Sequence, residues 1–105
     1  MSIDFSNLTD LNQMILDWGR EKGILPNPEP LRQLEKTEEE VAELRTAIEE
    51  HDIAEVKDAI GDIYVTLTMQ AEAWGMTMEE CIQAAYDVIK TRTGKMVGGK
   101  FIKDQ

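Results

Sequence analysis

The chain of 105 residues is long enough for one domain with a modest hydrophobic core. Its 21 acidic and 11 basic residues give a formal charge of -10, which predicts repulsion from nucleic acid and from anionic membranes. A single cysteine and a single histidine exclude an internal disulfide and a Cys/His zinc site, and the lack of a long apolar run or a signal-like N-terminus predicts a cytoplasmic protein.

Helical periodicity dominates the sequence. The first helix is predicted over residues 7–22 and ends at Gly23, and the connection that follows holds all three prolines. Apolar spacing predicts further helices over residues 31–50, 52–74 and 77–93. No segment has the alternating pattern of a convincing strand. We therefore predict a single all-α domain over residues 1–105, built as an antiparallel bundle of about four helices.

Polar residues mark where the last two helices begin. Asp52 with Glu55, and Thr77 with Glu80, have the spacing of capping boxes, in which the first side chain binds the amide three residues later. The link between the second and third helices is correspondingly short. These two helices are therefore predicted to fold back on each other as an antiparallel hairpin, with His51 at the turn.

The predicted third helix is apolar on two sides. One broad face carries bulky side chains at helical spacing, and a second stripe continues the line of Asp58 and Asp62. The broad face consists of Ile60, Ile63, Tyr64, Leu67, Ala71 and Trp74, and the stripe of Val65 and Met69. A helix buried on two sides in so short a chain needs a second subunit to cover it. We therefore predict that the bundle is completed as a homodimer or homotetramer.

Basic residues gather near the C-terminus. Five of the eleven lie in the last sixteen residues, namely Lys90, Arg92, Lys95, Lys100 and Lys103. Gly94 is predicted to end the fourth helix and to open a flexible basic segment over residues 94–105. A basic tail on an otherwise acidic chain suits a polyanionic ligand that carries metal; solvation, or pairing with acids elsewhere, is the alternative.

Two pairs of acids on neighbouring helices are the most informative residues. Glu40 and Glu43 are three apart, and Asp58 and Asp62 four apart, so each pair projects from one side of its helix. In an antiparallel hairpin, residues whose numbers have a constant sum lie level, which pairs Glu40 with Asp62 and Glu43 with Asp58. Four carboxylates in one patch repel one another unless a cation lies among them. An all-oxygen cluster favours Mg²⁺, with Mn²⁺ as the alternative.

Several motifs, taken in order, resemble a known family. They are Gln33-x-x-Lys36-x-x-Glu39-Glu40-Val41-Ala42-Glu43-Leu44, Gly61-Asp62-Ile63 and Lys90-x-Arg92-x-Gly94-Lys95, with Trp18 and Glu21-Lys22-Gly23-Ile24-Leu25-Pro26 upstream. The chain resembles the MazG-like nucleoside triphosphate pyrophosphohydrolases of the all-alpha NTP pyrophosphatase superfamily, and its short, single-domain, phage-type members in particular. The resemblance implies Mg²⁺-dependent hydrolysis of an NTP or dNTP to the monophosphate and pyrophosphate, in nucleotide-pool housekeeping.

The sequence departs from the family's motifs in one place. The family has Glu-Glu-x-x-Glu followed by Glu-x-x-Asp, and with Asp62 as the final acid this chain has Ala59 where the second motif begins. We expect Asp58 to replace the missing carboxylate. Glu55 forms a literal Glu-x-x-Asp with Asp58 and is the alternative, although the hairpin pairing puts it one turn beyond Glu43.

The resemblance and the hairpin pairing together imply roles for single residues. The candidate metal ligands, all carboxylates, are Glu40, Glu43, Asp58 and Asp62. The candidate phosphate contacts, all basic, are Lys36, Lys90, Arg92 and Lys95. Glu39 or Glu40 would orient or deprotonate the attacking water, and Asp87 would make a polar contact near the sugar or phosphate. Trp18, Gln33 and Tyr86 are candidates for base binding, although a Trp on an apolar helical face is more often a core residue.

Other functions stay open. The nearest are enzymatic: a relative that acts on phosphoribosyl-ATP, or a dUTPase-like member. The alternative from a different class is a non-catalytic helical adaptor whose acidic stripe binds a basic partner. Nothing in the sequence selects the base or sugar of a substrate or the number of metal ions.

Overall fold

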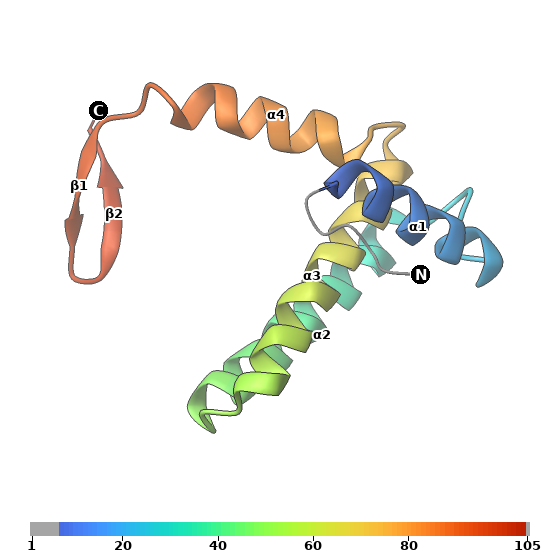
Figure 1. The fold of residues 1–105 in the computed structure, drawn as a ribbon, viewed down its shortest axis with the longest axis horizontal. Coiled ribbons are helices and arrows are strands. Elements are labelled where there is room, and N and C mark those ends of the chain that lie inside the picture. The colour runs from blue at the N-terminus through green and yellow to red at the C-terminus, as the bar shows by residue number, and fades with distance from the viewer. Residues whose placement is uncertain (1–6, 105) are drawn as a thin grey trace.

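The computed structural model describes residues 7–104, and the fold is all-α, as predicted. Its helices are α1 (Leu8–Glu21), α2 (Pro30–Glu49), α3 (Ile53–Ala73) and α4 (Met78–Ile89). Two short strands follow, β1 (Gly94–Val97) and β2 (Lys100–Lys103) (Figure 1). In the described part of the chain, no helix is both long enough and apolar enough to cross a membrane.

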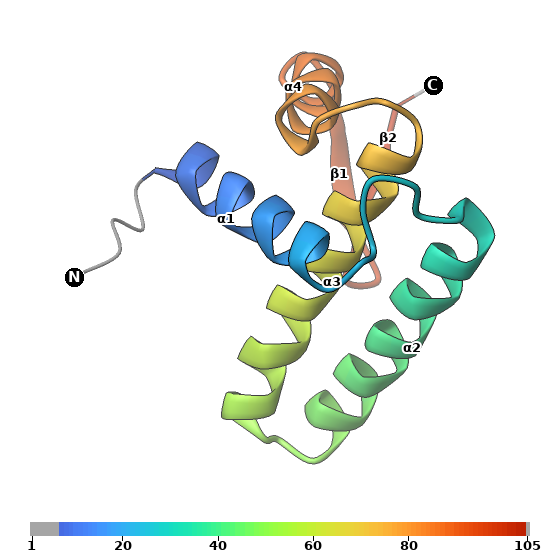
Figure 2. The same cartoon turned by 90° about the vertical axis from the view of Figure 1, so that its right-hand side faces the viewer.

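Helices α2 and α3 form the predicted antiparallel hairpin and lie side by side in both views (Figure 1, Figure 2). The turn places His51 at a positive φ of 55°. The Asp52 carboxylate then accepts a hydrogen bond from the Glu55 backbone N–H at 3.1 Å and caps α3. Ala47 of α2 and Ala59 of α3 are both buried. The short turn therefore sets the register that brings the middle of α2 opposite the middle of α3.

Helix α1 packs against α3 through a glycine (Figure 2). A Cβ atom at Gly19 would lie 2.6 Å from Cε of Met69, which is itself only 1% exposed. Any larger residue at this position would have to displace a core side chain. The close approach places α1 beside α3, so that the two helices border the same grooves.

A polar junction joins α1, α3 and α4. The buried Asn12 side chain donates from Nδ2 to Oε1 of Glu79 at 2.9 Å, and its Oδ1 accepts from the Tyr64 hydroxyl at 2.6 Å. The hydroxyl of Thr77 accepts a hydrogen bond from the Glu80 backbone N–H at 3.1 Å, as the capping pattern predicts. Because buried polar groups are costly unless they are paired, the contacts of Asn12 fix the direction in which α4 leaves the other helices.

The C-terminal segment differs from the prediction. The fourth helix ends at Ile89 rather than near Thr93, and residues predicted to hold no strand pair as an antiparallel hairpin. Gly98 and Gly99 both adopt positive φ at the turn, as two-residue hairpin turns require. The strands escape sequence detection because each has only four residues, all exposed, and each face mixes basic with apolar side chains.

A large apolar surface stays exposed. Helix α4 leads away from the α2–α3 hairpin, with the small sheet at its far end (Figure 1). The exposed apolar side chains of α4 and the sheet are Ile82, Tyr86, Val88, Ile89, Met96, Val97, Phe101 and Ile102. On the predicted broad face of α3, Ile60, Leu67 and Trp74 are exposed as well. Exposed apolar residues on this scale are typical of a surface that another chain covers.

Candidate active site

Three carboxylates from α2 and α3 converge near the middle of the hairpin. Glu40, Glu43 and Asp62 each offer one carboxylate oxygen, and these oxygens all lie within 4.8 Å of one another. The i, i+3 spacing puts the two glutamates on one side of α2, and the hairpin register brings Asp62 opposite them. The arrangement gathers three of the four predicted ligands.

The carboxyls of Glu40 and Asp62 lie close to other carboxyls, and their pKa values are raised. Burial raises the pKa of Glu40, the neighbouring carboxyls of Glu43 and Asp62 raise it further, and Lys36 opposes them. Burial also raises the pKa of Asp62, with added contributions from Asp58 and Glu43. Among residues 7–104, Oε2 of Glu40 is a buried side-chain oxygen without a hydrogen-bond partner. An excess of oxygen ligands with an unpaired buried atom fits a small divalent cation such as Mg²⁺.

Asp58 lies beside the cluster rather than within the group of three. Its carboxyl is close enough to raise the pKa of Asp62, one turn further along α3. Asp58 and Asp62 together border a groove of about 580 Å³ between α1 and α3. The pairing of Asp58 with Glu43, which the hairpin arithmetic predicts, is therefore looser than that of Glu40 with Asp62.

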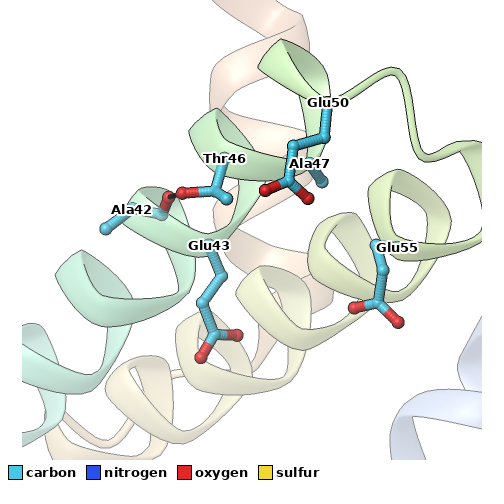
Figure 3. A pocket seen from close by; sticks show the side chains of 6 residues that line it. All are labelled: Ala42, Glu43, Thr46, Ala47, Glu50 and Glu55. Carbon is cyan, nitrogen blue, oxygen red and sulfur yellow. Dashed lines mark hydrogen bonds between the residues drawn. The ribbon is translucent and has the colours of Figure 1, made fainter.

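Glu55 belongs to a separate pocket near the α2–α3 turn. The pocket has a volume of about 420 Å³, and the carboxylates of Glu43, Glu50 and Glu55 surround it together with Ala42, Thr46 and Ala47 (Figure 3). Glu43 is thus shared between this pocket and the acidic cluster. Among residues 7–104, Glu55 is not part of the group formed by Glu40, Glu43 and Asp62.

Glu39, one of the two residues predicted to act on the attacking water, is an exposed side chain of α2. Its carboxylate pairs with the Lys36 ammonium at 2.9 Å, and both side chains are exposed. This ion pair raises the pKa of Lys36 above its ordinary value, so Lys36 stays charged. Glu39 and Lys36 therefore form an outer pair next to Glu40.

A pocket of about 390 Å³ lies beside the acidic cluster, among α1, α2 and α3. Its lining consists of Trp18, Ile24, Gln33, Lys36, Glu40, Asp62, Val65, Thr66 and Met69. The Gln33 side chain is held by a hydrogen bond from Nε2 to the Thr66 carbonyl at 3.3 Å. Trp18 is 44% exposed and is not a core residue. The pocket thus combines an aromatic wall, an amide and an ammonium with two members of the acidic cluster.

Thr66 and Met69 were not predicted as site residues. Thr66 is buried, and its hydroxyl accepts a hydrogen bond from the Thr37 hydroxyl at 2.9 Å. The hairpin pairing that matches Glu40 with Asp62 could have predicted Thr66. In that pairing, residues whose numbers have the same sum lie level, which puts Thr66 opposite Lys36. Met69 carries no polar signal, and its place in the pocket depends on the packing of α1 against α3.

The other predicted substrate contacts lie away from the cluster. Asp87 is on α4, Lys95 is on β1, and Lys90 and Arg92 lie in the connection between them. Asp87 accepts from the Lys90 ammonium at 3.2 Å, and both side chains are half-exposed. Figure 1 shows this end of α4 and the sheet pointing away from the α2–α3 hairpin. Within one chain, these four residues are not brought to the acidic cluster.

Comparison with known proteins identifies the family. The family model for phosphoribosyl-ATP pyrophosphohydrolase matches residues 8–91, which include all of α1 to α4 and the acidic cluster. Comparisons with curated proteins and with solved structures give no match. The family match indicates a pyrophosphohydrolase, a hydrolase acting on acid anhydrides, with a nucleotide-like substrate. The chain belongs to the phosphoribosyl-ATP pyrophosphohydrolase family, within the MazG-like all-alpha NTP pyrophosphatase superfamily.

Proposed function

We propose that this protein is a Mg²⁺-dependent pyrophosphohydrolase that cleaves a nucleoside or deoxynucleoside triphosphate to the monophosphate and pyrophosphate. The observation that carries the proposal is the acidic cluster of Glu40, Glu43 and Asp62 at the edge of a pocket large enough for a nucleobase. Family membership supports the reaction class. We propose that this activity serves nucleotide-pool housekeeping in the cytoplasm.

The metal would be held by Glu40, Glu43 and Asp62, with Asp58 close enough to join them. When bound, Mg²⁺ supplies the positive charge that neutralises the phosphate oxygens of the substrate, and Mn²⁺ has suitable ligand chemistry for the same role. The unpaired Oε2 of Glu40 and the mutual repulsion of the carboxyls support this assignment.

Hydrolysis adds water across the anhydride bond between the α- and β-phosphates. One P–O bond forms to the water oxygen, the anhydride P–O bond breaks, and pyrophosphate leaves in line. Glu39 or Glu40 would accept the water proton, and the ion pair with Lys36 holds the Glu39 side chain next to Glu40 on α2. Lys36 is also placed to contact a phosphate, because it lines the pocket with Glu40 and Asp62.

The pocket would hold the base and sugar. Trp18 offers an aromatic surface for stacking, and Gln33 is held in place by the Thr66 carbonyl. Neither residue distinguishes one base from another. A second candidate substrate is phosphoribosyl-ATP, which the family match favours. It contains the same triphosphate, so the same carboxylates would serve, and a dUTPase-like preference is equally compatible with the cluster.

A substrate panel tests the proposal. Release of pyrophosphate is measured with Mg²⁺ for the common NTPs and dNTPs, dUTP included, and for phosphoribosyl-ATP, and Asp62→Asn is the matched control. We expect pyrophosphate from at least one of these triphosphates and a large loss of rate in the variant. Calorimetry with Mg²⁺ and a nonhydrolysable NTP tests the alternative that the protein is a non-catalytic adaptor. An adaptor would bind neither the metal nor the nucleotide. No turnover and no binding would overturn the proposal.

The proposal includes a homo-oligomer, a dimer or a tetramer. Exposed apolar side chains on α3 and α4 support it, because a chain of this size has few other ways to bury them.

A further inference from the structure

Two threonines join α2 to α3 close to the acidic cluster. The hydroxyl of Thr37 on α2 donates a hydrogen bond to the Thr66 hydroxyl on α3 at 2.9 Å. The Thr66 hydroxyl donates in turn to the Ile63 carbonyl at 2.7 Å, and Thr66 is buried. A hydrogen bond between two hydroxyls holds only over a narrow range of distances. This threonine pair therefore fixes the spacing of α2 and α3 at its own level.

The threonine pair lies one helical turn from the acidic cluster on both helices. Thr37 precedes Glu40 by three residues on α2. Thr66 follows Asp62 by four residues on α3. Each offset is about one turn, roughly 5 Å, and each keeps the hydroxyl on the same side of its helix as the carboxylate. Because the helices are antiparallel, both offsets run towards the open end of the hairpin.

Repulsion among the carboxylates pushes the two helices apart at the level of the cluster. Oxygens of Glu40, Glu43 and Asp62 lie within 4.8 Å of one another, and they come from both helices. Towards the turn, Ala47 of α2 and Ala59 of α3 are buried. Towards the open end, the threonine pair links the helices. The cluster therefore lies between two levels at which the hairpin is closed.

The backbone of Thr66 also holds a residue of the proposed base pocket. Its carbonyl accepts the hydrogen bond from Nε2 of Gln33 at 3.3 Å. Gln33 and Thr66 both line the pocket that borders the acidic cluster. Thr66 is thus connected to α2 twice, through its hydroxyl and through its carbonyl, next to the proposed metal position.

We propose that Thr37 and Thr66 are positioning residues, which hold the carboxylates of α2 at the distance from Asp62 that a divalent metal ion needs. The inference rests on the proposed function, because the metal is the one assigned there. Mg²⁺ requires nearly ideal geometry with ligands at about 2.0–2.1 Å, so a small increase in the spacing of the helices weakens its binding. The threonines act through that spacing rather than as ligands.

Valine can replace either threonine without leaving a hydroxyl proton unpaired. In Thr37→Val, the Thr66 hydroxyl keeps the Ile63 carbonyl as its acceptor. In Thr66→Val, the Thr37 hydroxyl keeps the Gln33 carbonyl of its own helix, at 3.2 Å. Each variant loses the link between the helices and should still fold, with a melting temperature within a few degrees of the wild type. Thr37 is only half-buried, so its variant tests the inference even if Thr66→Val unfolds.

Titration of the metal-free protein with Mn²⁺, followed by the electron paramagnetic resonance of the free ion, measures metal affinity without nucleotide. We expect Thr37→Val and Thr66→Val each to raise the dissociation constant about tenfold. The double variant should be no weaker than either single one, because all three lack the same hydrogen bond. Thr37→Ser keeps the hydroxyl and should bind as the wild type does. Pyrophosphate release at limiting Mg²⁺ should fall in parallel with the affinity.

The matched control is another link between the same helices, further from the cluster. Nε2 of Gln70 on α3 donates to the Pro30 carbonyl of α2 at 3.0 Å, and Gln70 is eight residues from Asp62. Gln70→Met removes this hydrogen bond and should leave Mn²⁺ affinity unchanged. A loss equal to that of the threonine variants would overturn the inference, because the site would then respond to any loosening of the hairpin.

The titration separates this inference from the proposed function. Wild-type Mn²⁺ affinity in Thr37→Val would overturn the positioning role and leave the proposed function standing, since the metal would bind without the threonine pair. Weak binding by Thr37→Ser as well would also overturn it, because the hydroxyl would not be what matters. A wild-type protein that binds no Mn²⁺ would overturn both the metal site and the inference that rests on it.

Discussion

At the scale of single residues, the carboxylates of the acidic cluster destabilise the folded chain by repelling one another. Glu40 and Asp62 are partly buried carboxyls whose pKa values are raised, so their negative charges are held together against repulsion. An apolar or amide side chain packed at the same positions would destabilise the folded state less. The proposed Mg²⁺ would offset this repulsion.

Glu43→Gln and Asp62→Asn test the contributions of α2 and of α3 to the cluster separately. We expect each variant to lose at least about 100-fold in pyrophosphate release, because each removes a carboxylate from the group of three. Circular dichroism should show unchanged helical content, since the amides are isosteric and relieve repulsion. Near-normal turnover in both variants would refute the site assignment.

Asp58→Asn and Glu55→Gln decide which acid replaces the one absent at Ala59. Asp58 raises the pKa of Asp62, whereas Glu55 lines the pocket near the turn. We expect Asp58→Asn to be the more damaging by about tenfold in turnover, at equal substrate and Mg²⁺. The reverse order would show that the literal Glu-x-x-Asp motif is the working one.

The raised pKa of Asp62 has a thermodynamic consequence. The folded-state pKa lies above the unfolded value, so the folded chain binds this proton more tightly. The resulting stability is fully present below the unfolded pKa and is lost as pH rises through the folded pKa. In metal-free buffer, Asp62→Asn should therefore melt above the wild type at pH 7, and the difference should shrink as pH falls below the ordinary carboxyl range.

Thermal melts between pH 3.5 and 7 measure this difference. Added Mg²⁺ should raise the melting temperature of the wild type and have a smaller effect on the variant, because binding to the folded state stabilises it. A variant that melts below the wild type at every pH would mean that the Asp62 carboxylate makes a stabilising contact rather than a repulsive one.

At the scale of elements, local signals set the helix boundaries, and distant contacts set the helix directions. Asp52 and Thr77 cap their helices through their own neighbours in sequence. The direction of α4, in contrast, depends on Asn12 and Tyr64, which belong to other helices. The position of the sheet at the end of α4 therefore depends on the same contacts of Asn12.

The flexibility of residues 94–105 stays a prediction, and hydrogen exchange tests it. Gly98 and Gly99 form the turn of a sheet with no buried residue, so its amides should exchange quickly in the empty protein. A nonhydrolysable NTP with Mg²⁺ should slow exchange between Gly94 and Phe101 if this segment meets the phosphates. Unchanged exchange there would assign the segment to solubility or to contacts independent of nucleotide.

At the scale of the whole molecule, the described residues bury little apolar surface. Their buried apolar side chains are few, and half of them are the alanines Ala47, Ala59 and Ala71, while apolar side chains of α3, α4 and the sheet are exposed. A second copy would supply the missing half of the core. The association would then be part of folding.

Sedimentation measures this association. Leu67 is 41% exposed on α3, and Leu67→Asp would place an unpaired charge in the proposed interface at a cost of several kcal/mol. We expect the wild type to sediment as a dimer or tetramer and the variant to dissociate at micromolar concentration. Leu31→Asp, at the start of α2, is the matched control and should stay associated. A monomeric wild type would contradict the proposed oligomer.

The sequence alone determined the helices and the pairing of α2 with α3, because apolar spacing and end caps act over a few residues and a short turn leaves one register. Glu40 and Asp62 could be matched for that reason. Tertiary structure decided the rest: the pocket at Trp18 and Thr66 exists because α1 crosses α3 at Gly19, and the direction of α4 follows from a side-chain contact 67 residues apart in the chain. Contacts between distant residues depend on how whole elements pack, and no periodicity within a single element records that packing.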